Sequence, residues 1–158
     1  MSAEDRLAIS DLVYRYAELI DAGDFDGMGA LLGRADFGGA NTPTMSGANV
    51  AGLFAMTTRL FPNHEGPGTP KTRHLVLNLI VDIADDATAA ARSTFCVIQA
   101  TDLVPLQPII AGRYRDRFAR DDGGWYFTER IIDVEMVGDV SDHLLIDHRQ
   151  FDGPRQQG

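Results

Sequence analysis

Two residues, Asp21 and His74, have the types and settings that a general base requires. Asp21 falls in the last turn of a predicted amphipathic helix, where the negative end of the helix dipole disfavours a carboxylate unless water or a positive group compensates it. His74 opens the longest strand-like run of the chain, TRHLVLNLIVDIA. A carboxylate that accepts the proton of one imidazole nitrogen leaves the other nitrogen free to act as a base. The alternative is a hydrogen-bonded core histidine with no chemical role.

Such a base would remove a proton from a carbon beside a carbonyl or a leaving group, which gives elimination, isomerisation or ring closure. A positioned base contributes about 10²–10⁴-fold in rate, and this chemistry requires no metal or organic cofactor. The oxyanion that develops would be held by Tyr14 or Tyr114 with help from Asn78. Phe54 is expected to shape the substrate pocket.

The other three histidines lie in loop or tail contexts. His143 and His148 are spaced like a possible pair of metal ligands, but their polar surroundings favour solvated histidines. His64 lies in a segment rich in proline and glycine. No metal site is therefore expected from the histidines.

The first part of the chain has the pattern of helices. Ser2 and Asp5 form a capping-box pattern at the start of a predicted helix over residues 3–22. Asp24 is placed to cap a short second helix, and Ser46 a third one over residues 46–61. A strand-like segment, ADFGGA, precedes the third helix. The segment PNHEGPGTPK at residues 62–71 is predicted to be a mobile lid.

The second part has the pattern of strands, predicted at residues 72–84, 88–101, 109–120 and 125–137. In the first of these, alternation places His74, Val76, Asn78 and Ile80 on one face and Leu75, Leu77, Leu79 and Val81 on the other. In the third, Gly112, Tyr114, Asp116 and Phe118 alternate with Arg113, Arg115 and Arg117. Arg130 is expected to form a structural ion pair with an acid across the sheet. Helices followed by a long-stranded meander predict an α+β fold.

Composition narrows the class of protein. The 158 residues are 44% apolar and 23% charged, which is typical of one globular domain spanning 1–158, with a polar tail from about residue 139. The net charge of −9 and a single lysine, Lys71, argue against binding to nucleic acid or an anionic membrane. Cys96 is the only cysteine and is expected to be a small buried hydrophobic residue. No signal peptide or membrane span is recognisable, so the expected location is the cytoplasm.

Five segments in order resemble the SnoaL-like branch of the nuclear transport factor 2-like superfamily: YAELIDAGDFDGMGALL, TRHLVLN, GRYRDRF, DDGGWYFTER and GDVSDHL. The resemblance covers nearly the whole chain. It implies a cone-shaped fold, in which a strongly curved mixed sheet wraps around helices and an apolar pocket opens at one end. It also implies a homodimer or homotrimer. The family includes scytalone dehydratase, hexachlorocyclohexane dehydrochlorinase, polyketide cyclases, ketosteroid isomerase and noncatalytic small subunits of ring-hydroxylating dioxygenases.

In the dehydratase and dehydrochlorinase branches, a catalytic Asp at the end of the first helix pairs with a catalytic His at the start of a central strand. Asp21 and His74 match those positions, so the resemblance implies a lyase or isomerase acting on a small apolar or aromatic substrate. The chain departs from scytalone dehydratase in two places. It has no second histidine around residues 97–99, and Ile20 replaces the tyrosine before the Asp. Both departures argue for a different substrate. The competing interpretation is a noncatalytic ligand-binding or assembly subunit.

Overall fold

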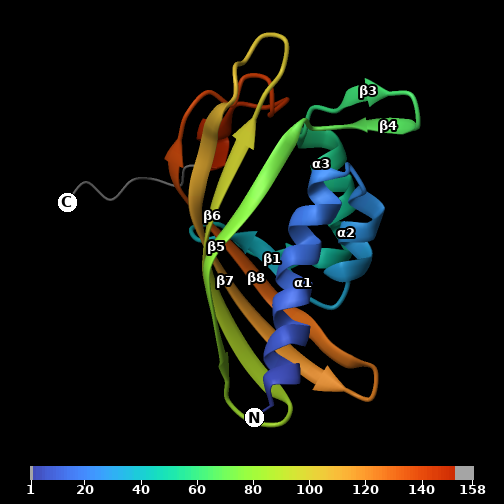
Figure 1. Ribbon diagram of the computed structural model, residues 1–158, viewed down its shortest axis with the longest axis vertical. Helices are drawn as coiled ribbons and strands as arrows, with labels where there is room; N and C mark the ends of the chain where they lie inside the picture. The colour runs from blue at the N-terminus through green and yellow to red at the C-terminus, as the bar shows by residue number, and fades with distance from the viewer. Residues whose placement is uncertain (1, 152–158) are drawn as a thin grey trace, which may run out of the picture.

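The computed structural model describes residues 2–151 and has an α+β fold, as predicted. Its helices α1–α3 lie on one side of a curved mixed sheet (Figure 1). The helices are α1 (Ala3–Asp21), α2 (Phe25–Leu31) and α3 (Val50–Thr57), with short 3-10 helices η1 (Gly47–Asn49) and η2 (His148–Phe151). The strands are β1 (Asp36–Gly39), β2 (Met45–Ser46), β3 (Phe61–Asn63), β4 (Gly66–Thr69), β5 (Thr72–Ile83), β6 (Thr88–Gln99), β7 (Gln107–Asp121) and β8 (Gly124–Val137).

The main sheet has the strand order β2-β1-β8-β7-β6-β5. The four long strands form an antiparallel meander, and β1 pairs in parallel with β8. The predicted boundaries of these four strands differ from the observed ones by two residues or fewer. Within residues 2–151, no helix is both long and apolar enough to cross a membrane.

Helix α1 starts and ends where the sequence predicts. Ser2 and Asp5 form the expected capping box, in which the Ser2 hydroxyl accepts from the Asp5 amide. The helix packs against the sheet through one apolar stripe. The stripe consists of Ile9, Val13, Tyr16, Ala17 and Ile20. At the other end Gly23, with φ of +72°, reverses the chain, and a Cβ there would lie 2.5 Å from the Gly68 carbonyl oxygen of β4. Only glycine fits this contact, so the turn fixes where α1 ends.

The third helix is shorter than predicted. Ser46 caps the 3-10 helix η1 through a bond from the Ala48 amide, and α3 ends at Thr57 instead of residue 61. Thr58 takes an extended conformation and forms an isolated bridge with Leu144. Pairing with a distant segment therefore ends the helix, and local sequence carries no signal of it.

Residues 62–71 do not form the loop that the sequence predicts. Strands β3 and β4 pair in an antiparallel hairpin that projects from the body of the protein, with His64 exposed in its turn (Figure 1). The glycines that suggest a loop allow the tight backbone of this hairpin, since Gly68 has a φ of +105°.

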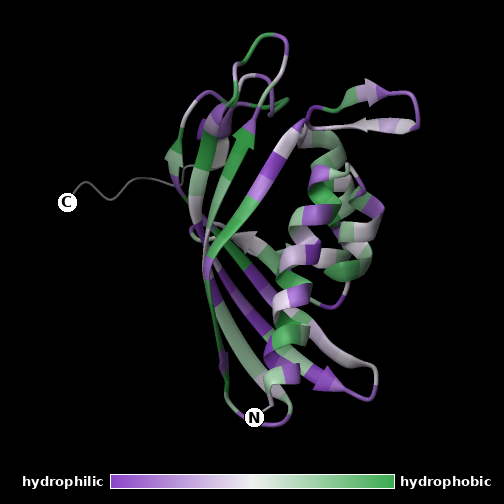
Figure 2. Ribbon diagram, viewed as in Figure 1, coloured by the Kyte–Doolittle hydropathy of each residue, from purple (hydrophilic) through white to green (hydrophobic). Residues whose placement is uncertain are grey.

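The face alternation in β7 is confirmed. Gly112, Tyr114, Asp116 and Phe118 are buried, and the three arginines between them are exposed. Hydrophobic and hydrophilic bands alternate along the lower part of the sheet in Figure 2. On the outer face, each arginine pairs with an acid of β8: Arg113 with Glu135, Arg115 with Asp133, and Arg117 with Glu129.

The face alternation in β5 is confirmed for its first half and wrong for its second. His74 and Val76 lie on the inner face and Leu75 on the outer face, as predicted. The pairing with β6 then shifts between Leu77 and Ile80, and Asn78 in that bulge has a φ of +54°. The extra residue moves Ile80 to the outer face, because the side-chain period of a strand is two. Asparagine tolerates this left-handed conformation better than most residues.

Candidate functional site

Asp21 and His74 are in direct contact. The His74 Nδ1 atom lies 2.6 Å from Asp21 Oδ1, and the backbone amide of His74 donates to Asp21 Oδ2 at 2.9 Å. The Thr72 hydroxyl donates to Asp21 Oδ1 at 2.9 Å. The His74 side chain is 6% exposed. The carboxylate thus fixes both the ring and the backbone of the histidine.

These contacts explain how a carboxylate is tolerated at the end of α1. Burial favours the neutral acid and is the largest influence on Asp21, but the hydrogen bonds and charge of His74, together with the Thr72 hydroxyl, outweigh it. The net result is a pKa below the ordinary value of 3.8. The compensation expected from an imidazole is therefore supplied jointly by His74, one backbone amide and one hydroxyl. Sequence reasoning missed Thr72, for which the only signal is its place at the start of the same strand.

A second polar cluster lies inside the sheet. Arg130 and Asp116 are directly opposite each other on β8 and β7, and both side chains are 0% exposed. Arg130 Nε and Nη2 donate to the two oxygens of Asp116 at 2.9 and 3.1 Å. The guanidinium carbon lies 4.1 Å from the Tyr16 ring centroid and 4.0 Å from that of Tyr114. The predicted structural ion pair of Arg130 is therefore confirmed, with two aromatic rings flanking it.

Tyr16 and Tyr114, which flank this cluster, also feel the charge of Asp21. Their rings meet edge to face with centroids 5.9 Å apart. Burial raises the pKa of Tyr16 to about 12 and that of Tyr114 well above 10, Arg130 opposes both rises, and the charge of Asp21 adds to both. Both hydroxyls are therefore protonated at neutral pH and remain so well into the alkaline range. Tyr114, predicted as a pocket residue, thus lies in the protein interior within the field of the Asp21 carboxylate.

The sequence interpretation of His143 is wrong. This residue was expected to be a solvated tail histidine, but it is 6% exposed, and its ring centroid lies 6.4 Å from that of His74 at 62°. Burial is the main cause that lowers its pKa to about 4; the nearby His74 acts in the same direction, and Asp21 opposes the change. The segment is polar in sequence, but two of its side chains, Val140 and His143, are buried.

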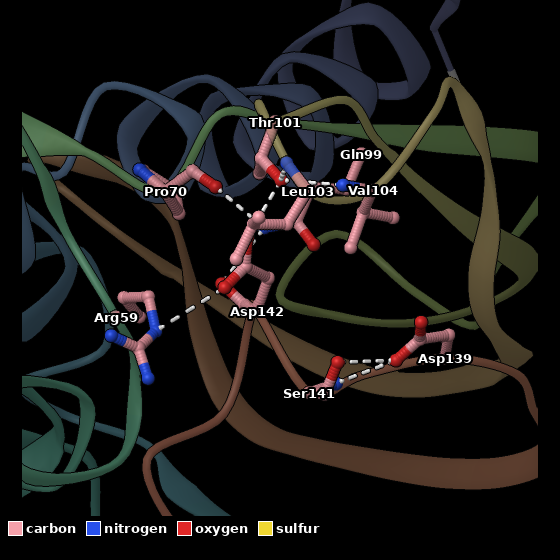
Figure 3. Close-up of polar contacts among 9 residues, drawn as sticks. All are labelled: Arg59, Pro70, Gln99, Thr101, Leu103, Val104, Asp139, Ser141 and Asp142. Carbon is pink, nitrogen blue, oxygen red and sulfur yellow. Dashed lines mark hydrogen bonds and ion pairs between the residues drawn. The ribbon is translucent and has the colours of Figure 1, made fainter.

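The segment that carries His143 is attached to several elements at once. Asp142 is central: its carboxylate accepts from the Thr101 hydroxyl at 2.6 Å, and its backbone carbonyl accepts from Gln99 Nε2 at 3.2 Å (Figure 3). Gln99 Nε2 also donates to the Pro70 carbonyl, just before β5. Backbone bonds then join Arg59 to His143 at 2.8 Å and Leu145 to Thr57 at 2.9 Å. The segment is therefore anchored to the ends of α3 and β6 and to the start of β5.

The other predicted pocket residues do not gather around His74. Tyr14 is 49% exposed and lines a surface hollow of about 430 Å³ with Asp11, Arg15 and Glu18. It lies outside the stripe through which α1 packs. Asn78 is exposed because the bulge turns it outward. Phe54 is partly buried between Phe25 and Phe37, with ring centroids 5.8 and 6.1 Å away. It belongs to the core that joins the helices.

Two surface hollows lie away from Asp21 and His74. Besides the one beside Tyr14, a hollow of about 300 Å³ opens on the charged outer face of the sheet near Arg115 and Glu129. Cys96 also lies on the outer face and is half-buried, opposite Leu75. Among the described residues, no group of three or more His, Cys, Asp or Glu side chains has the arrangement of a metal site.

The profile of the SnoaL-like domain family matches residues 1–131, which include Asp21, His74, Asp116 and Arg130. The chain belongs to this family. His143 lies beyond the matched part. No curated protein matches this SnoaL-like chain closely enough to count as a relative.

Solved structures share the fold of this SnoaL-like protein at low sequence identity. An NTF2-like protein with a cystatin-like fold from Novosphingobium aromaticivorans is 22% identical, with a TM-score of 0.65 over 88% of this chain and 86% of that one. A proposed scytalone dehydratase from the same organism is 21% identical, with a TM-score of 0.64 over 85% and 86%. The β subunit of a proposed aromatic-ring-hydroxylating dioxygenase, again from that organism, is 16% identical, with a TM-score of 0.61 over 84% and 90%.

Proposed function

We propose that this protein is a cofactor-independent lyase or isomerase in which Asp21 and His74 form a general base that removes a proton from a carbon acid. The observation that carries the proposal is the contact of 2.6 Å between His74 Nδ1 and Asp21 Oδ1. A carboxylate at this distance holds the proton on Nδ1 and leaves the lone pair on Nε2 for the substrate.

The surroundings suit this role. His74 lies opposite Val97 of β6, on the inner face of the sheet, and its side chain is almost fully buried. When the imidazole takes a proton, the Asp21 carboxylate stabilises the cation that forms. Low polarity around the pair strengthens that stabilisation. The dyad therefore favours the protonated product of the abstraction step.

Two buried tyrosines are the candidate donors for the charge that develops on the substrate. The protonated hydroxyls of Tyr16 and Tyr114 are buried in the same interior, where a hydrogen bond to an oxyanion is worth more than in water. The aromatic surfaces of this region favour a small apolar or aromatic substrate. The likeness to a proposed scytalone dehydratase supports a lyase within this fold.

The proposal is tested with a carbon acid that any exposed or buried base can attack, 5-nitrobenzisoxazole. Removal of its ring C–H proton forms a nitrile and breaks the N–O bond, which releases a coloured phenolate. We expect His74→Gln to lower the second-order rate constant by roughly 10²-fold or more and Asp21→Asn to lower it by a smaller factor. The matched control is His64→Gln, since His64 is exposed in the β3–β4 turn. Turnover by His74→Gln at the wild-type rate would refute the proposal.

A second function has support in the likeness to a dioxygenase β subunit. In that case the protein is a noncatalytic binding or assembly subunit, and the contact between Asp21 and His74 is structural. This second function predicts that the wild-type protein does not turn over the benzisoxazole. It also predicts no hydrogen–deuterium exchange of ketones. It also predicts that the protein co-purifies with a larger iron–sulfur subunit, whereas a lyase acts without one.

A further inference from the structure

His143 is a second imidazole at the candidate site, and no hydrogen bond accounts for it. Its side chain is almost fully buried, and its Nδ1 atom has no partner within the described part of the chain. A buried polar atom without a partner costs free energy, so such an atom in a native protein calls for an explanation, and a ligand that binds it is one. The nearby Gln99 is 1% exposed, and its Oε1 atom also lacks a described partner.

The position of His143 is fixed by its backbone. Its amide donates to the Val140 carbonyl at 3.0 Å, and its carbonyl accepts from the Arg59 amide at 2.8 Å. On one side, Asp142 is held by Thr101 and Gln99, as Figure 3 shows. On the other side, Leu144 bridges to Thr58. The imidazole is therefore presented to His74 by a segment anchored before and after it.

The protonation state of His143 follows from its surroundings. The titratable groups that face it are His74 on β5 and Asp21 on α1, with burial as the dominant influence. Because burial and His74 outweigh the opposing charge of Asp21 and lower the pKa of His143 to about 4, its imidazole is neutral at pH 7. A neutral imidazole is a hydrogen-bond donor that carries no net charge, and an enolate oxygen is a suitable acceptor for it.

We propose that His143 binds the oxygen of the substrate, so that the substrate is a carbonyl compound with an acidic C–H bond beside the carbonyl. This inference rests on the proposed function. His74 Nε2 takes the proton from the α-carbon, the C–H electron pair forms a C=C bond, and the carbonyl π pair moves to oxygen. The imidazole N–H of His143 donates to that oxygen.

The separation of the two rings fits this division of labour. The α-carbon and the carbonyl oxygen are two bonds apart, and each must come within about 2.6–3.2 Å of its imidazole nitrogen. The two imidazoles are in edge-to-face contact, with ring centroids 6.4 Å apart at 62°, so a small group seated against both rings can reach one nitrogen of each. A simple haloalkane has no oxygen for His143 to bind, so the geometry favours carbonyl substrates over it.

The test measures binding without turnover. The probes are 4-nitrophenolate, which carries an aromatic oxyanion, and nitrobenzene, which lacks it. We expect wild-type protein to bind the phenolate more tightly and His143→Phe to weaken phenolate binding by roughly 10-fold, the effect of losing one hydrogen bond to a charged group. Nitrobenzene affinity should change by less than about 3-fold, since Phe keeps the apolar volume. His64→Phe serves as the matched control, and His143→Gln, which retains an N–H donor, should recover part of the phenolate affinity.

Three outcomes overturn the inference: equal affinity of wild type for both probes, an equal loss for both probes in His143→Phe, or no loss for either. Folding of each variant is checked by its unfolding transition in urea. The outcomes for this inference and for the proposed function are distinguishable. If His74→Gln keeps benzisoxazole turnover while His143→Phe loses phenolate selectivity, the base fails and the oxygen site stands. If instead His74→Gln loses benzisoxazole turnover while His143→Phe keeps phenolate selectivity, only the role of His143 is refuted.

Discussion

His74 is held by Asp21 at two points, through its ring and through its backbone. The Nδ1 atom lies 2.6 Å from one carboxylate oxygen, and the amide donates to the other oxygen at 2.9 Å. A single carboxylate thereby joins the last residue of α1 to the start of β5. The same contacts that orient the imidazole also contribute to the stability of the fold.

The first prediction concerns the stability that Asp21 contributes. Its folded-state pKa lies below 3.8, so the stabilisation is complete above that ordinary value and is lost as the pH falls through the folded pKa. We expect Asp21→Asn to lower the free energy of unfolding at pH 7 by about 1–3 kcal/mol. The difference from wild type should shrink near pH 3. Urea unfolding at both pH values measures it, with Asp11→Asn on the exposed face of α1 as the control. A difference that is the same at both pH values would contradict the assignment.

The second prediction concerns the acid side of His143. The folded-state pKa of about 4 lies below the ordinary 6.5, so the unfolded chain binds the proton first. Stability that is complete above about pH 6.5 should therefore fall as the pH drops toward 4, by about 3 kcal/mol in total, since one pKa unit corresponds to about 1.4 kcal/mol. Urea unfolding of wild type and His143→Phe at pH 7, 5.5 and 4.5 measures this loss. If the variant shows the same decline with pH as wild type, His143 is not the group responsible.

The third prediction concerns the buried pair of Arg130 and Asp116. We expect Arg130→Met to destabilise the protein by about 3–5 kcal/mol, because it leaves an uncompensated carboxylate among aromatic rings. The double variant Arg130→Met with Asp116→Leu should recover most of that loss, since it removes both charges. Arg115→Met on the exposed outer face is the control and should leave the unfolding midpoint unchanged. A double variant no more stable than Arg130→Met alone would argue that the pair is not the source of the loss.

The fourth prediction concerns the bulge in β5. Asn78 has a φ of +54°, a conformation that costs an ordinary L-residue roughly 1–2 kcal/mol. Asn78→Val should therefore destabilise the protein by about that amount or more, and Asn78→Gly should be close to neutral. Thermal unfolding of the two variants provides the comparison. Equal melting temperatures for the valine and glycine variants would mean that the bulge relaxes without strain.

The fifth prediction concerns self-association. A row of apolar side chains crosses the outer face, from Leu75 through Cys96 and Ala111 to Met136, and the exposed Leu77 lies beside it. Exposed apolar patches of this kind mark interfaces, so we predict a homodimer or homotrimer. Leu77→Asp should shift the sedimentation coefficient to that of a monomer. Leu7→Asp, which also replaces an exposed leucine but on α1, should not. A wild-type protein that sediments as a monomer at all concentrations would refute the prediction.

The residues themselves determine the local elements of this protein. The capping box at Ser2 and Asp5, the cap at Asp24 and the alternation along β7 act over a few residues, and each occurs as the sequence predicts. The contact between Asp21 and His74 could also be anticipated, because a carboxylate at a helix C-terminus needs compensation by water or a positive group and both residues match the positions of the catalytic pair in related proteins. Only the structure identifies the Thr72 hydroxyl and the His74 amide as part of that compensation.

Tertiary structure alone decided the rest of the site. The bulge at Asn78 exchanges the inner and outer faces for the side chains in the second half of β5. A backbone pairing between Thr58 and Leu144 ends α3 earlier than predicted. His143 became a buried neighbour of His74 because Asp142, Gln99 and Thr101 anchor its segment across the sheet end. The contacts of Thr58 and of the His143 segment join residues more than forty positions apart in the chain, and no periodicity or local propensity encodes them. Their free energy comes from burial and hydrogen bonds that exist only after the sheet has closed over the helices.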